Sequence, residues 1–125
     1  MSQDVLIGVD AGTSVIKAVA FDLDGRQIAI DSRRNSYRAL SNGGVEQDMA
    51  RTWDDTVAVL RGLGERLPGL ADRVLAIGVT GQGDGCWLID EEGRPAHDGW
   101  FWLDARAASE AREIEASPGL SLLHI

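Results

Sequence analysis

The segment Asp10–Ser14, which reads Asp-Ala-Gly-Thr-Ser, separates two apolar runs, Val5–Val9 and Val15–Phe21. Two apolar runs around so short a bend predict an antiparallel pair of strands. A carboxylate, a glycine and two hydroxyls at such a bend can hold a phosphate and its metal ion, because turn N–H groups form an anion-binding concavity. Gly12 adds no Cβ that would keep a ligand away. The same residues also suit an ordinary hairpin connection, so both interpretations stay open at this point.

The chain up to residue 68 predicts two further elements. The turn signal Asp24-Gly25 leads into a third strand, Arg26–Ser32, so the first three strands form an antiparallel meander. Residues 33–47 are polar and are expected to be irregular. Asp48 is suited to the N-cap of a helix, which Pro68 would stop. Apolar residues recur in this helix at three- and four-residue steps, which predicts a core-facing stripe: Trp53, Val57, Leu60, Leu63 and Leu67.

The chain after residue 68 predicts the remaining elements, and their order indicates a fold class. Val74–Val79 is expected to be a buried strand parallel to the first, because a helix connects the two. Cys86–Asp90 and Gly99–Trp102 are expected to be extended, and Arg106–Ala116 helical. Three antiparallel strands, a crossover helix and a parallel strand predict an α/β fold of the ribonuclease H-like, actin-like ATPase class, incomplete at the C-terminus. Val74–Val79 would then lie at an unpaired edge, which invites pairing with another chain and predicts a homodimer.

Composition excludes several classes of function. The 125 residues suffice for one domain at most, and the net charge of −8 opposes non-specific binding to nucleic acid or to an anionic membrane. The lone cysteine, Cys86, permits no intrachain disulfide, and no apolar run is long enough to span a membrane. The N-terminus lacks the basic region of a signal peptide, so a cytoplasmic location is expected. In so acidic a chain, an anionic ligand needs local positive charge or a metal ion.

Four blocks in the expected order resemble the FGGY family of carbohydrate kinases. The resemblance extends from about Val5 to Arg112, and each block alone is short. The blocks are Asp10–Ser14 with Lys17, Gly44–Asp48 with Trp53, Ile77–Gln82, and Trp102–Arg106. A different actin-like protein, such as a chaperone-like ATPase or a repressor, is disfavoured by the last two blocks.

This resemblance implies two domains that close over a cleft, and ATP- and Mg²⁺-dependent phosphorylation of a hydroxyl on a pentulose or polyol. Asp10 would face the Mg²⁺ ion. The β- and γ-phosphates would be lined by Gly12, Thr13, Ser14 and Lys17, although Lys17 is equally well interpreted as a solvated strand lysine. The sugar or polyol would be contacted by Gln82, Gly83, Asp84, Trp102 and Asp104, with Arg106 anchoring the last segment.

Two departures from the family pattern limit this interpretation. Xylulokinase-like members have Met-His after the glutamine and glycerol kinase-like members have Arg-Glu, whereas this chain has Gly83-Asp84. A polyol such as erythritol and a ketopentose therefore remain equally suitable substrates. The family's catalytic-base aspartate, adenine site and second phosphate loop lie beyond the length of this chain. We therefore expect residues 1–125 to be a partial N-terminal domain without activity of its own; the alternative is a non-catalytic module that binds a sugar or phosphate.

Overall fold

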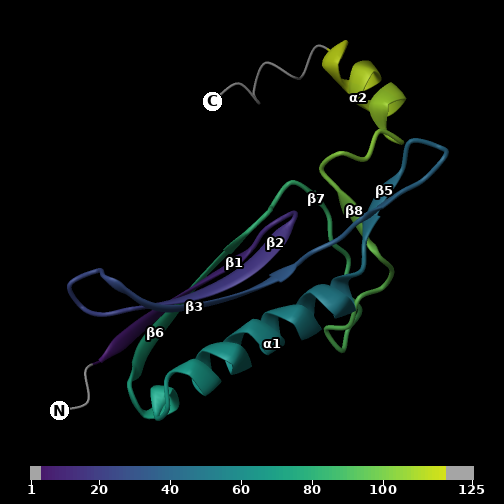
Figure 1. The fold of residues 1–125 in the computed structure, drawn as a ribbon. Helices are drawn as coiled ribbons and strands as arrows, with labels where there is room; N and C mark the ends of the chain where they lie inside the picture. Colours follow the sequence, from purple (N-terminus) through teal and green to yellow (C-terminus); the bar gives the residue numbers. More distant parts are fainter. Residues whose placement is uncertain (1–3, 118–125) are drawn as a thin grey trace.

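The computed structural model describes residues 4–117, which form two four-stranded sheets and two α-helices (Figure 1). The larger sheet has the strand order β3-β2-β1-β6, and the smaller one β4-β5-β8-β7. The strands are β1 (Val5–Ala11), β2 (Val15–Phe21), β3 (Gln27–Arg34), β4 (Arg38–Ala39), β5 (Val45–Gln47), β6 (Val74–Gly81), β7 (Gly85–Cys86) and β8 (Gly99–Phe101). The helices are α1 (Met49–Arg66), a 3₁₀ turn (Leu70–Asp72) and α2 (Ala108–Glu115).

The larger sheet confirms the predicted topology. β1, β2 and β3 are antiparallel neighbours, and β6 pairs with β1 in parallel. Helix α1 connects β5 to β6 and runs along the larger sheet (Figure 1). The carboxyl ends of β1 and β6 therefore meet at the same edge of the sheet, where open α/β sheets place their ligands.

The core lies between α1 and one face of the larger sheet. Alternate residues of β1 and β2 point into it, as the two-residue period of a strand requires, and α1 contributes Val59 and Leu63. β2 presents two alanines there, which leave room for the helix to approach. The buried strand residues are Val5, Ile7, Val9, Ile16, Ala18 and Ala20.

Both ends of α1 follow the sequence signals. The Asp48 side chain accepts a hydrogen bond of 2.9 Å from the backbone N–H of Arg51, which satisfies a donor that the first helical turn leaves free. At the other end, the Leu67 N–H donates to the Leu63 carbonyl. Pro68 and the left-handed Gly69, with φ of 74°, then end the helix.

The predicted helical stripe was wrong at Trp53, whose side chain is 68% exposed. The buried residues are Val59 and Leu63, with Leu60 and Leu67 packed at the border of the core. Six residues of α-helix correspond to a rotation of about 240°, so Trp53 and Val59 point to well-separated sides of α1. Apolar spacing alone admitted both faces, and contact with the sheet selected one.

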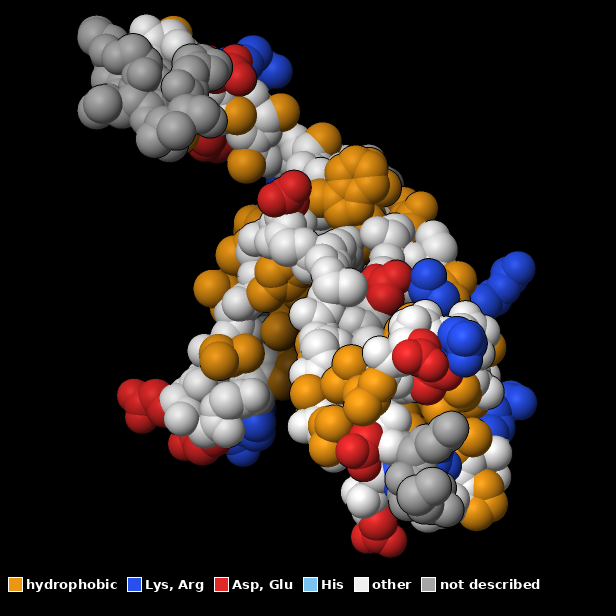
Figure 2. Space-filling view, turned by 90° about the vertical axis from the view of Figure 1, so that its left-hand side faces the viewer, with side chains coloured by type: hydrophobic (Ala, Val, Ile, Leu, Met, Phe, Trp, Pro, Cys, Tyr) orange, Lys and Arg blue, Asp and Glu red, His pale blue; other side chains and the backbone are white. Residues whose placement is uncertain are grey.

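The prediction that Val74–Val79 is buried was also wrong. Leu75, Ile77 and Val79 of β6 are 60%, 52% and 73% exposed. Helix α1 packs against β2 and β3, and within residues 4–117 no element covers this part of β6. β6 is the edge strand of the described sheet, as expected. Figure 2 shows hydrophobic side chains open to solvent on one side of the molecule.

The smaller sheet was only partly predicted. Residues 33–47, expected to be irregular, contain β4 and β5. The expected strand Cys86–Asp90 is reduced to β7 and to an isolated bridge between Ile89 and Pro95. Strands of two or three residues are too short to show an alternating pattern, and their partners are distant: Glu46 of β5 lies opposite Trp100 of β8. α2 is shorter than the expected helix at both ends.

Within residues 4–117, no helix has both the length and the apolar character needed to cross a membrane.

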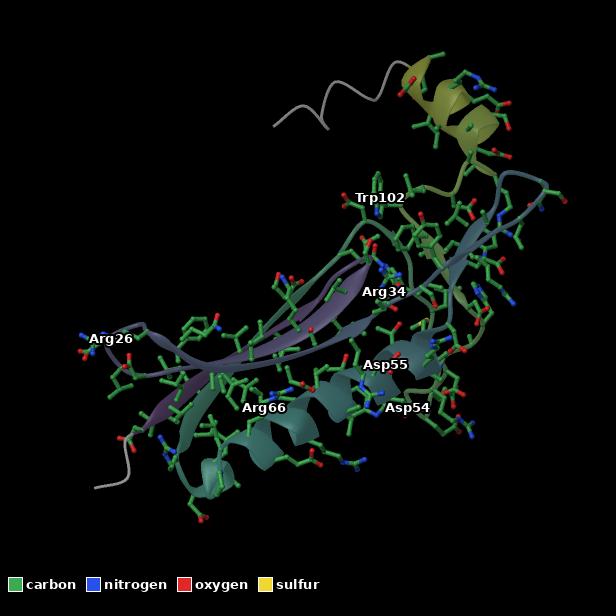
Figure 3. The ribbon with its side chains drawn as sticks, viewed as in Figure 1. Arg26, Arg34, Asp54, Asp55, Arg66 and Trp102 are labelled. Carbon is green, nitrogen blue, oxygen red and sulfur yellow. The ribbon has the colours of Figure 1, made fainter. Side chains whose placement is uncertain are left out.

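Ion pairs connect the surface of α1 to β3. Arg66 Nη2 lies 2.9 Å from Asp31 Oδ1, and Arg33 Nη1 lies 3.6 Å from Asp55 Oδ1. Figure 3 shows Arg66 and Asp55 on α1.

Two glycines of α1 are expected to respond oppositely to replacement by alanine. Alanine normally stabilises a helix by about 1 kcal/mol relative to glycine. Gly64→Ala should show this gain, because an added Cβ would meet nothing within 4 Å. Gly62→Ala should lose it, because its Cβ would lie 2.1 Å from Asp31 Oδ2 and would displace the carboxylate that pairs with Arg66. Urea unfolding checks this, and an equal gain for both variants would contradict the packing of α1 on β3.

Candidate functional site

Asp10 lies near the carboxyl end of β1, opposite Lys17 on β2 and Thr80 on β6. Lys17 Nζ is 3.3 Å from Asp10 Oδ2, and both side chains are partly exposed. A groove of about 350 Å³ opens beside this pair. It is lined by Gly8, Val9, Asp10, Lys17, Val19, Phe21, Gly78, Val79 and Thr80. Two adjacent strands thus place a carboxylate and an ammonium group at an open groove.

The β1–β2 turn is held in shape by contacts within the protein. An added Cβ on Gly12 would lie 2.9 Å from the Val15 carbonyl oxygen and 3.3 Å from Asp10 Oδ1, so a side chain here would disturb both the turn and the carboxylate. The Asn35 side chain donates to the Gly12 carbonyl at 2.9 Å, and its backbone N–H donates to the Ser14 carbonyl at 2.9 Å. Asn35 was missed by the sequence analysis, since an asparagine after a strand carries no signal of such contacts.

Gln82 follows β6 directly and connects this turn to the interior. Thr13 Oγ1 donates to Gln82 Oε1 at 3.3 Å, and Gln82 Nε2 donates to Gln47 Oε1 at 2.7 Å. Gln47 Nε2 in turn donates to the Ser36 carbonyl at 3.5 Å. The structure therefore brings together one residue expected at the phosphates and one expected at the polyol. Gln47 appeared in the sequence only as part of the Gly44–Asp48 block, where its role was open.

Gly83 and Asp84 come next and are exposed. An added Cβ on Gly83 would meet nothing within 4 Å, so this position leaves open space beside Gln82. Trp102, in the segment between β8 and α2, is 54% exposed (Figure 3). Its indole can cover the apolar side of a carbon chain while its N–H remains available.

Asp104 has a different environment, because its carboxylate is occupied within the protein. Its side chain is only 8% exposed. Oδ2 accepts from the Val45 N–H at 2.7 Å and from Arg106 Nη2 at 2.6 Å, and Oδ1 accepts from the Arg106 N–H at 3.0 Å. The geometry thus favours a structural role for Asp104 over the expected contact with substrate.

Arg106 connects this carboxylate to the smaller sheet, as the anchoring role expected for it requires. Its Nη1 donates to Glu46 Oε1 at 3.0 Å, and its Cζ lies 4.3 Å from the centroid of the Trp100 ring. Hydrogen bonds from Arg106, the largest influence, and from the Val45 N–H hold the pKa of Asp104 well below its ordinary value. Asp104, Arg106 and Glu46 together fix the segment that carries Trp102 against β5.

Asp104→Asn is expected to lower the thermal unfolding midpoint at pH 7 and to remove part of its pH dependence. Because the folded-state pKa of Asp104 is lowered, its stabilising effect is present above the ordinary aspartate pKa of about 3.9 and is lost as the pH falls below it. The difference from the unaltered chain should therefore shrink below about pH 4. Asp54→Asn, at an exposed position of α1, is the matched control. A constant difference between pH 7 and pH 3 would contradict this role.

The Asp10 carboxylate fits a Mg²⁺ ion that arrives with a nucleotide. Among residues 4–117, no group of three or more His, Cys, Asp or Glu side chains is placed to hold a metal ion. Asp10 offers a single carboxylate beside the groove, and Mg²⁺ is commonly bound by one or two carboxylates together with substrate phosphates. This donor set suits a shared metal better than a resident one.

Comparisons with known proteins identify the family of this chain. Residues 5–121 match the FGGY family of carbohydrate kinases, N-terminal domain. The erythritol kinase of Brucella abortus is 56% identical over 92% of this chain and 22% of its own length, and the glycerol kinase of Rhodospirillum rubrum is 33% identical over 89% and 23%. The crystal structure of xylulose kinase from Rhodospirillum rubrum superimposes with a TM-score of 0.86 at 28% identity, over 94% of this chain and 24% of that one.

The chain therefore spans about a fifth of the length of the curated relatives it matches. The resemblance drawn from the four sequence blocks and the predicted actin-like fold are both confirmed. The match covers the β1–β2 turn, Gln82 and the segment from Trp102 to Arg106, which make up the described site. The chain belongs to the FGGY family of carbohydrate kinases.

Proposed function

We propose that this chain supplies the phosphate-facing and polyol-facing part of a kinase that transfers the γ-phosphate of ATP to a hydroxyl of a small polyol. The observation that carries the proposal is the hydrogen bond between Thr13 and Gln82, beside Asp10. It joins a turn suited to phosphate and a strand end suited to hydroxyl groups. Phosphoryl transfer requires this proximity, because catalysis rests on positioning and on neutralising charge.

One group of residues would face the nucleotide and its metal ion. Asp10 would face the Mg²⁺ ion, and the turn residues Gly12 and Ser14 would line the β- and γ-phosphates, with Thr13 between them in the same turn. Mg²⁺ bound with the nucleotide would neutralise charge on the phosphoryl oxygens. Lys17, which pairs with Asp10, would keep that carboxylate compensated when no nucleotide is bound.

Polyol specificity would come from the exposed residues after β6 and from Trp102. Gln82 and Asp84 would exchange hydrogen bonds with hydroxyl groups, and Gly83 would leave room for the carbon chain. We favour a four-carbon polyol such as erythritol, because this chain is 56% identical to an erythritol kinase and 33% identical to a glycerol kinase. A site that hydrogen-bonds each substrate hydroxyl discriminates strongly against compounds that lack one.

The test uses a chimera in which this chain replaces the matching segment of the Brucella abortus erythritol kinase. Titration calorimetry with erythritol, glycerol and xylulose should show erythritol binding at least tenfold more tightly than the other two. Asp84→His should reduce this preference by roughly tenfold, as expected when a polar partner of a substrate hydroxyl is lost. A folded chimera that binds none of the three would contradict the proposal, and an unchanged preference in Asp84→His would remove that residue from the site.

The isolated 125-residue chain is expected to transfer no phosphate. Within residues 4–117, one face of the site is open to solvent, whereas phosphoryl transfer needs closure that excludes water. The measurement is ADP release with erythritol and Mg–ATP by the purified chain. Polyol-dependent ADP release would contradict the expected inactivity.

We also propose that two copies of this chain pair through the open edge of β6. Light scattering of the same sample tests whether the chain is a dimer.

A further inference from the structure

Gln47 is the one polar residue among residues 4–117 that is almost fully buried, with 2% of its surface exposed. It ends β5, directly before the N-cap of α1, and lies opposite Gly99 of β8. A buried amide is costly unless its groups are hydrogen-bonded. Both ends of the Gln47 amide have partners, Gln82 on one side and the Ser36 carbonyl on the other.

The Ser36 carbonyl fixes the direction of this chain of hydrogen bonds. A carbonyl oxygen only accepts, so Gln47 must present its NH₂ group to Ser36 and its oxygen to Gln82. Gln82 must then present its NH₂ group to Gln47 and its oxygen to Thr13. An oxygen facing Thr13 requires the hydroxyl to donate. Reversing either amide would place two acceptors against each other.

We propose that Gln47 is a positioning residue that, through Gln82, sets the orientation of the Thr13 hydroxyl in the phosphate-facing turn. The inference rests on the proposed function, since it assigns the turn to a nucleotide. Because the Thr13 proton is committed to Gln82, the oxygen has only lone pairs left for a ligand. Thr13 therefore faces the nucleotide as an acceptor, suited to Mg²⁺ or to a water that the ion holds. From the sequence alone, Thr13 was expected to contact the phosphates themselves.

The first test detects the chain of hydrogen bonds from Thr13 through Gln82 to Gln47, and it needs no kinase activity. In the ¹⁵N-labelled 125-residue chain, the side-chain NH₂ signals of Gln47 and Gln82 are assigned by their loss in Gln47→Met and Gln82→Met. Thr13→Val removes the hydroxyl and should shift the Gln47 signal, although Thr13 and Gln47 share no hydrogen bond in the structure. Thr13→Ser keeps the hydroxyl and should leave that signal in place. If the Gln47 signal does not shift in Thr13→Val, the proposed coupling through this chain of hydrogen bonds is overturned.

The second test separates positioning from simple packing in the chimera. Gln47→Met and Thr13→Val should each raise KM for Mg–ATP by roughly tenfold, and the double variant should be no worse than the more affected single variant, because residues that act as a unit are not additive. Gln27→Met, at an exposed position of β3, should leave KM unchanged. Effects that multiply would overturn the proposal. A chimera without any activity would contradict the proposed function. The NMR signals would still test whether Gln47 is coupled to Thr13 through Gln82.

Discussion

Asp10→Asn is expected to lower the polyol-dependent rate of ATP consumption by the chimera roughly a hundredfold or more, the size of effect seen when one electrostatic partner of a transferring group is removed. Asparagine keeps the size of the side chain and an oxygen that can accept from Lys17. It lacks the negative charge that holds Mg²⁺ and its nucleotide at the groove. The loss should therefore be in turnover and in the Mg²⁺ concentration required, with little change in stability, because Asp10 is only partly buried.

Asp24→Asn is the matched control, since it makes the same change in the exposed β2–β3 turn. Its rate should equal that of the unaltered chimera. Thermal unfolding of both variants shows whether each is folded. A folded Asp10→Asn chimera whose rate stays within threefold of the unaltered protein would remove Asp10 from the site and leave the β1–β2 turn as an ordinary hairpin.

Leu63→Ala is expected to lower the free energy of unfolding by about 2–5 kcal/mol, the range for truncating a buried leucine. Leu63 is 0% exposed and belongs to the cluster that joins α1 to β1 and β2. Small domains have a total stability of only about 5–15 kcal/mol, so this loss is a large part of the whole. Leu75→Ala on β6 makes the same change at a residue that is 60% exposed, and should cost well below 1 kcal/mol. Equal losses in urea unfolding would contradict the packing of α1.

Local signals predicted most of the larger sheet. The apolar runs on either side of Asp10–Ser14 indicate β1 and β2, and Asp48 and Pro68 mark the ends of α1 because capping and ring geometry act over a few residues. Trp53 and β6 were wrongly assigned to the core because their burial depends on which element covers them. That information is tertiary, and the spacing of apolar residues does not contain it.

The candidate site likewise combines features that the sequence indicated with contacts that it did not. The sequence left Lys17 open between a phosphate contact and a solvated strand lysine, whereas the observed register of β1 and β2 places it opposite Asp10. Gln47 and Gln82 are separated by 35 positions and Gly12 and Asn35 by 23, so their contacts could not be read from adjacent residues. Asp104 was expected to contact the substrate, but its hydrogen bonds to Arg106 and Val45 favour a role in the structure of the site.

The most direct test of the account is whether ADP release by the chimera depends on the polyol. We predict that the chimera forms ADP and phosphorylated erythritol in equal amounts, and that omission of erythritol nearly abolishes ADP release. The same kinase without the replaced segment should do neither. A folded chimera that hydrolyses ATP equally with and without erythritol would contradict the claim that this chain joins a phosphate-facing turn to a polyol-facing strand end.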